Sequence, residues 1–121
     1  MATYSKIILS GSTDGQAIVV TGTTASQGTV VHTGVTGAAD SIDELWIYAQ
    51  STVTTAAQIS LAVGPTTATG SRLHHTVTGD DKKGLILIYP GLPLRNAKVV
   101  KAYATSADIF QMWGHVQRYA T

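Results

Sequence analysis

The chain has 121 residues, 44% of them hydrophobic and 12% charged, with a net charge of +1 and no cysteine. The length suits one domain, residues 1–121, and the composition excludes a disulfide-stabilised scaffold or a strongly basic nucleic-acid-binding protein. No apolar run approaches the roughly 18 residues of a membrane-spanning helix, and Met1–Lys6 has no signal-peptide pattern. We therefore expect neither nucleic acid nor a membrane among its partners.

Glycine-rich turns separate short segments rich in β-branched residues along the whole chain, a pattern typical of an all-β sandwich. We expect about eight or nine antiparallel strands and little or no helix, because no long segment repeats apolar residues at helical spacing. Asp14 and Gly15 predict a hairpin turn, since both tolerate a positive φ. The candidate strands are Lys6–Ser10, Ala17–Thr21, Thr29–Thr33, Leu45–Gln50, Gln58–Val63, Leu73–Thr78, Leu85–Tyr89, Lys98–Ala104 and Phe110–Tyr119.

The most apolar segment runs from Leu85 to Tyr89, between a glycine and Pro90. As a strand that stops at Pro90, it would direct its odd-numbered residues to one face and Ile86 and Ile88 to the other. A sheet with one wet face alternates apolar and polar residues, and this run does not. We therefore expect Leu85, Ile86, Leu87 and Ile88 to be buried in the assembled protein, under the opposing sheet and under a loop or a second copy of the chain.

Two further strands carry large aromatic side chains opposite their predicted core face. Alternation in Leu45–Gln50 places Trp46 and Tyr48 together, and in Phe110–Tyr119 it places Trp113 and His115 together. Aromatic residues on an otherwise polar face are enriched at protein interfaces. These residues are candidates for a subunit or partner interface, with shielding by loops of the same subunit as the alternative.

Charge is distributed unevenly along the chain. Residues 1–71 contain one basic residue and four acidic ones, whereas residues 72–121 contain seven basic residues and three acidic ones. Unlike halves suit head-to-tail contacts around a closed ring, so we expect self-association. The basic interface candidates are Arg95, Lys98 and Lys101.

Residue patterns for catalysis or metal binding are weak. Adjacent His74 and His75 project to opposite faces of a strand and cannot jointly bind one ion without a bulge. Asp43 and Glu44 are expected at loops rather than at a substrate, and Asp80–Lys83 is expected to form a polar hairpin tip rather than a calcium loop. Serine, histidine and aspartate are present, but no local pattern brings them together. We expect no enzyme, no metal and no cofactor.

Three segments occur in an order that resembles a known class of protein. They are Leu9-Ser-Gly-Ser-Thr-Asp-Gly15, Asp43-Glu-Leu-Trp-Ile-Tyr-Ala49 and Pro90-Gly-Leu-Pro-Leu94. Together they resemble small virion structural proteins of tailed bacteriophages, of the type that decorates the head. The likeness extends from Lys6 to Tyr119.

The resemblance implies a jelly-roll-like β-sandwich that binds the outer surface of the phage head as a cement protein. It implies a homotrimer and a major capsid protein as partner, with stabilisation of the shell by multivalent contacts. The alternative is a carbohydrate-binding module of a phage fibre or a surface lectin, in which Trp46 and Trp113 would stack on sugar rings.

Overall fold

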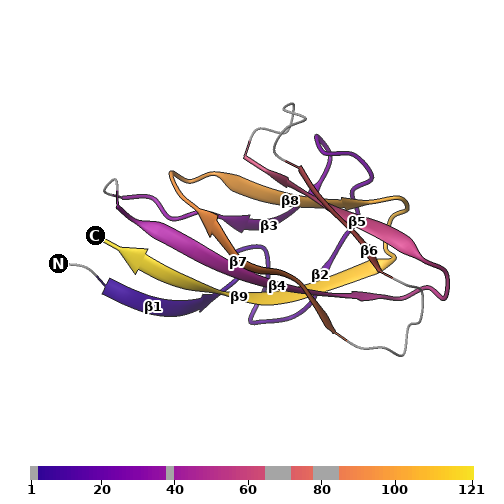
Figure 1. The fold of residues 1–121 in the computed structure, drawn as a ribbon, viewed down its shortest axis with the longest axis horizontal. Coiled ribbons are helices and arrows are strands. Elements are labelled where there is room, and N and C mark those ends of the chain that lie inside the picture. Colours follow the sequence, from indigo (N-terminus) through magenta and orange to yellow (C-terminus); the bar gives the residue numbers. More distant parts are fainter. Residues whose placement is uncertain (1–2, 38–39, 65–71, 78–84) are drawn as a thin grey trace.

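In the described part of the chain, nine strands form two antiparallel sheets that pack face to face as a sandwich (Figure 1). The computed structural model describes residues 3–37, 40–64, 72–77 and 85–121. Sheet A has the order β1-β9-β4-β7, with β2 also paired to β9, and contains β1 (Thr3–Ile8), β2 (Ile18–Val19), β4 (Ile42–Ser51), β7 (Ile86–Leu94) and β9 (Phe110–Ala120). Sheet B has the order β3-β8-β5-β6 and contains β3 (Thr29–Thr33), β5 (Ala57–Val63), β6 (Arg72–Val77) and β8 (Val99–Ala104).

The core lies between the sheets and follows the alternation of the strands. Leu45 and Ile47 of β4 and Phe110 of β9 are fully buried from the side of sheet A. Ile59 and Leu61 of β5 meet them from sheet B and are equally inaccessible. Burial of apolar surface at about 25 cal/mol per Å² is the main stabilising term of such a sandwich.

Each predicted strand overlaps an observed strand, although some bounds differ by several residues, and the all-β sandwich is confirmed. None of the described ranges contains a helix, and so none contains a helix long and apolar enough to cross a membrane. The expected polar tip Asp80–Lys83 lies outside the described residues. Asp14 and Gly15 have positive φ values of 54° and 81°, as their turn requires. The hairpin prediction is nevertheless wrong, because β1 and β2 both pair with β9 and not with each other.

The apolar strand β7 differs from its prediction in extent and in facing. It continues through Pro90 to Leu94, which an edge strand permits because one side of its backbone needs no partner. The register of β7 against β4 shifts twice, once between Leu87 and Tyr89 and once between Tyr89 and Leu92. Gly91 lies within the latter shift and adopts a φ of 68°. These bulges turn both Ile88 and Tyr89 toward the core.

The outward side of β7 is not buried within the chain. Leu85 and Leu87 remain 49% and 39% exposed, whereas Ile86 and Ile88 pack against the core. A loop of the same chain therefore does not bury Leu85 and Leu87, and their burial under a second copy of the chain stays a prediction. Their exposure leaves an apolar edge on the outer face of sheet A.

In the described strands, the acidic and basic halves of the sequence do not form separate faces. β4, from the acidic half, lies between β7 and β9, from the basic half. The described strands therefore do not supply the separate acidic and basic surfaces on which the prediction of head-to-tail contacts was based, and those contacts stay a prediction. Charge instead differs between the sheets: the described strands of sheet B contain Arg72 and Lys101 and no carboxylate, whereas those of sheet A contain both signs.

Candidate functional site

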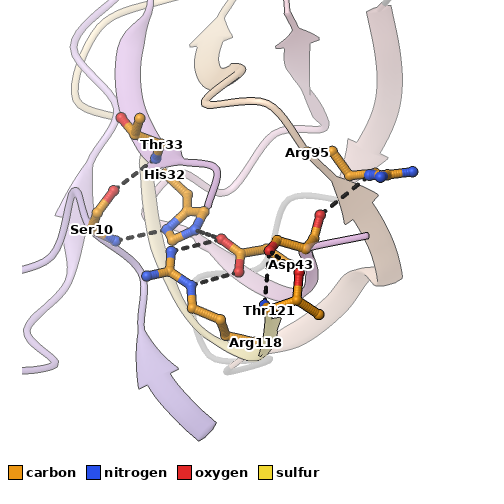
Figure 2. Close-up of polar contacts among 8 residues, drawn as sticks. Ser10, His32, Thr33, Asp43, Arg95, Arg118 and Thr121 are labelled. Atoms are coloured by element: carbon orange, nitrogen blue, oxygen red, sulfur yellow. Dashed lines mark hydrogen bonds and ion pairs between the residues drawn. The ribbon is translucent and has the colours of Figure 1, made fainter. Parts of the chain in front are cut away.

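A buried polar cluster joins the two sheets at one end of the sandwich. Figure 2 shows His32 of β3 and Arg118 of β9 converging on the carboxylate of Asp43 in β4. His32 Nε2 lies 2.7 Å from Asp43 Oδ2, and Arg118 donates from Nε and Nη2 at 2.7 and 2.8 Å. The side chains of His32 and Asp43 are fully buried. Asp43 therefore does not face a loop, contrary to the prediction.

The hydrogen bonds of this cluster determine its protonation. The backbone N–H of Ser10 donates to His32 Nδ1 at 3.0 Å, so Nδ1 is an acceptor and Nε2 carries the proton donated to Asp43. Burial alone would raise the pKa of Asp43. The hydrogen bonds from Arg118 and His32 outweigh burial and lower that pKa. The carboxylate is thus held ionised inside the sandwich.

This cluster brings serine, histidine and aspartate together, but not as a catalytic triad. In a triad the serine hydroxyl bonds to the imidazole, whereas here the backbone of Ser10 makes that contact. The Ser10 hydroxyl accepts from the backbone N–H of Thr33 at 2.7 Å. His32 is also closed to solvent. The geometry suits a structural link between β3, β4 and β9 rather than nucleophilic chemistry.

The second candidate is an aromatic patch on the outer face of sheet A. Two rows of directly paired residues cross the sheet, Ile8–His115–Trp46 and Trp113–Tyr48–Leu87. Val19 of β2 lies on the same face, one pair further along β9. We call this set the aromatic patch, and it consists of Ile8, Val19, Trp46, Tyr48, Leu87, Trp113 and His115.

The rings of the aromatic patch support one another. The His115 ring stacks on Trp46 at a centroid distance of 6.3 Å with an interplanar angle of 8°. The ring of Tyr48, which belongs to the neighbouring row, lies 6.4 Å from that of His115. Trp46 Nε1 donates to Glu44 at 2.9 Å, which leaves the indole ring fixed in place. Burial and the nearby charge of Lys6 lower the pKa of His115, so its ring is neutral at neutral pH.

The predicted interface residues separate into two groups in the structure. Trp46, Tyr48, Trp113 and His115 share the aromatic patch. The basic candidates lie elsewhere.

Lys101 lies on β8 in sheet B, paired with Val30 on one side and Ala62 on the other. Arg95 and Lys98 lie in the turn that connects β7 and β8. Arg95 Nε donates to the Ser41 carbonyl at 3.2 Å, which ties this turn to the start of β4 (Figure 2). Lys98 and Arg95 therefore flank sheet B at its connection to sheet A.

The four histidines do not converge. His74 Nδ1 lies 2.7 Å from the Ser60 hydroxyl on the outside of sheet B, and the ring of His75 meets Tyr89 of β7 at 6.4 Å. The two neighbours thus lie on opposite faces of β6, as predicted. Among the described residues no group of three or more histidine or acidic residues could hold a metal ion.

Several surface residues of sheet A were not predicted as site residues, because only the pairing of the strands brings them together. Ile8 and Val19 belong to different strands, and only their shared partner β9 brings them to the same face. A shallow pocket of about 700 Å³ lies beyond the patch and includes Tyr4 and Tyr119, which the sequence did not single out. The only signal for them was the alternation within β1 and β9.

Comparison with models of protein families, with curated proteins and with solved structures returned no match for this chain.

Proposed function

We propose that this protein is a homotrimeric decoration protein of a tailed-bacteriophage head, which binds the major capsid protein on the outer surface and stabilises the shell. The aromatic patch is the observation that carries the proposal, because it gathers three exposed aliphatic side chains and four partly buried rings on one face of sheet A. The trimer, the virion and the capsid partner come from the resemblance of residues 6–119 to phage head proteins. No catalytic role is assigned.

We assign the aromatic patch to contacts between copies of the chain. Ile8, Val19 and Leu87 are each about two-fifths exposed, at 44%, 41% and 39%. They surround the partly buried rings of Trp46, Tyr48 and Trp113. Permanent homo-oligomer interfaces are more apolar than other surfaces and are enriched in aromatic residues. A neutral His115 in the middle adds no charge that association would have to desolvate.

We assign the capsid contact to sheet B. Its described strands bear Arg72 and Lys101 without a carboxylate, and the exposed Lys98 lies next to it. Exposed charge steers association and sets orientation more than it adds affinity. Three copies that bind together gain affinity through their high effective concentration, so weak contacts per copy are enough to hold the shell.

The jelly-roll topology is part of the same proposal. The order β1-β9-β4-β7 facing β3-β8-β5-β6, with most successive strands in opposite sheets, supports it. Jelly rolls are sandwiches of two Greek keys and occur in viral shell proteins and in lectins. The topology alone therefore does not select between these functions.

Light scattering tests the role of the aromatic patch. Leu87→Asp places a charge on an exposed position of the patch and should yield folded monomers, and Trp113→Ala should weaken the trimer. Tyr103→Ala is a matched control, since Tyr103 is a partly buried aromatic residue on β8 of sheet B. A wild-type monomer, or a trimer that withstands Leu87→Asp, would refute the assignment.

Sedimentation with purified heads of the phage that carries the gene tests the capsid contact. Lys101→Glu should weaken binding about tenfold, or about 1.4 kcal/mol, without dissociating the trimer. Lys101→Arg keeps the charge and should bind normally. Binding should fall as salt increases, because exposed charges are screened. Failure of the wild-type protein to bind heads would reject the decoration function.

A further inference from the structure

The pocket beyond the aromatic patch is a second, chemically distinct surface of sheet A. It has a volume of about 700 Å³ and lies over the ends of β1, β9 and β4. Two rows of paired residues form its wall and floor, Tyr4–Tyr119–Ile42 and Lys6–Gln117–Glu44. Its size is within the range of about 300–1,000 Å³ that small-ligand sites occupy.

An exposed aromatic ring stands at the edge of this pocket. Tyr4 is 80% exposed, and its ring is supported from one side by Tyr119 at a centroid distance of 4.8 Å and an interplanar angle of 55°. The pairing orients the Tyr4 ring and leaves much of it open to solvent. Such a ring offers a ligand an apolar surface with a polar hydroxyl at its end.

The floor of the pocket offers hydrogen-bond donors and acceptors side by side. Lys6, Gln117 and Glu44 are directly paired across three adjacent strands. The strand spacing places the backbones of Lys6 and Glu44 about 10 Å apart, with the Gln117 amide between them. Neither Lys6 nor Glu44 forms an ion pair within the described part of the chain. The Glu44 Oε1 atom accepts from Trp46, which leaves the other carboxylate oxygen for a ligand.

The charges of the pocket favour a neutral ligand. Lys6 is cationic, Glu44 and Asp40 are anionic, and the guanidinium of Arg118 is paired with Asp43. A phosphate or other anion would meet the carboxylates, and a cation would meet Lys6. A polyhydroxyl ligand can donate to a carboxylate and accept from an ammonium or amide at the same time. A sugar ring also has an apolar C–H face that matches an exposed tyrosine.

We propose that this pocket binds a neutral oligosaccharide, with Tyr4 as the stacking platform and Lys6, Gln117 and Glu44 as hydrogen-bonding partners. The site lies outside the aromatic patch, so this proposal does not rest on the function proposed above. It also differs from the saccharide site suggested by the sequence, because Trp46 and Trp113 belong to the patch and not to the pocket.

Chemical-shift mapping of the ¹⁵N-labelled full chain tests the site. Maltotriose, cellotriose and chitotriose, each at about 10 mM to detect millimolar affinities, are the probes. At least one should shift the amide signals of Tyr4, Lys6 and Gln117. Inorganic phosphate at the same concentration should not produce these shifts.

Variants then identify the groups that bind. Tyr4→Ala and Gln117→Ala should each weaken binding about tenfold, whereas Tyr4→Phe keeps the ring and should bind nearly normally. Tyr103→Ala, on sheet B, is the control for a lost aromatic ring. Absence of shifts with all three saccharides, shifts centred on Trp46 and Trp113, or unchanged binding by Tyr4→Ala would each overturn the proposal.

Discussion

Replacing Asp43 by asparagine tests whether the buried cluster holds the two sheets together. The substitution removes the charge and keeps nearly the same shape. Asp43 accepts three hydrogen bonds, one from His32 at 2.7 Å and two from Arg118 at 2.7 and 2.8 Å. The amide nitrogen of asparagine is a donor, so an N–H group of His32 or Arg118 would face another N–H group. His32 cannot relieve the conflict by changing tautomer, because its Nδ1 accepts from Ser10.

The expected loss follows from the burial of this contact. Removing one partner of a buried ion pair costs about 3–5 kcal/mol, a large fraction of the roughly 5–15 kcal/mol that stabilises a typical domain. Urea unfolding at neutral pH, followed by tryptophan fluorescence, measures the loss. Glu44→Gln is the matched control, since Glu44 is the exposed neighbour on the same strand and should change stability by less than about 0.5 kcal/mol. A loss below about 1 kcal/mol for Asp43→Asn would refute the structural role, by the cost expected for a buried pair.

The same variant has a distinct dependence on pH. Burial raises the pKa of Asp43, but the hydrogen bonds from Arg118 and His32 outweigh burial and lower that pKa in the folded chain. Its stabilisation is therefore fully present above the unfolded pKa of about 3.9 and is lost as pH falls through the folded value. The wild-type protein should lose stability on acidification below about pH 4, and Asp43→Asn should lose less there. Parallel losses in both proteins would contradict the argument.

Two further predictions concern packing in sheet A. Gly114→Ala should destabilise the fold by roughly 1–3 kcal/mol, because the added Cβ would collide with the carbonyl oxygen of Trp46 on the neighbouring strand. An unchanged midpoint of thermal unfolding would show that β4 and β9 can separate at little cost. Ile88→Ala should lower the stability of the dissociated chain by about 2–5 kcal/mol and Leu87→Ala by less than about 1 kcal/mol, since only Ile88 is buried in the core. Equal losses in urea unfolding would contradict the orientation of the β7 side chains.

The fold could be predicted from the sequence to the extent that it depends on local patterns. The alternation of Leu45, Ile47 and Ala49 against Trp46 and Tyr48 located β4 and both of its faces. Glycine-rich turns located the other strands. Pro90 was interpreted as the end of a strand, whereas at the edge of sheet A it is accommodated by bulges.

The candidate sites were predictable only where one strand carries the signal. Trp113 and His115 are neighbours on one face of β9, so alternation was enough to group them. Asp43 and Arg118 are 75 residues apart, and no local pattern connects them. Tyr4 meets Tyr119 because β1 pairs with the last strand, which depends on the whole topology.

Electron cryomicroscopy of heads mixed with the purified protein tests the central claim most directly. The density should contain three copies per site on the outer surface, with the aromatic patches of sheet A facing one another and sheet B toward the shell. Bare heads at saturating protein would contradict the decoration function. Single copies bound through the aromatic patch would contradict the assignment of that patch to contacts between subunits.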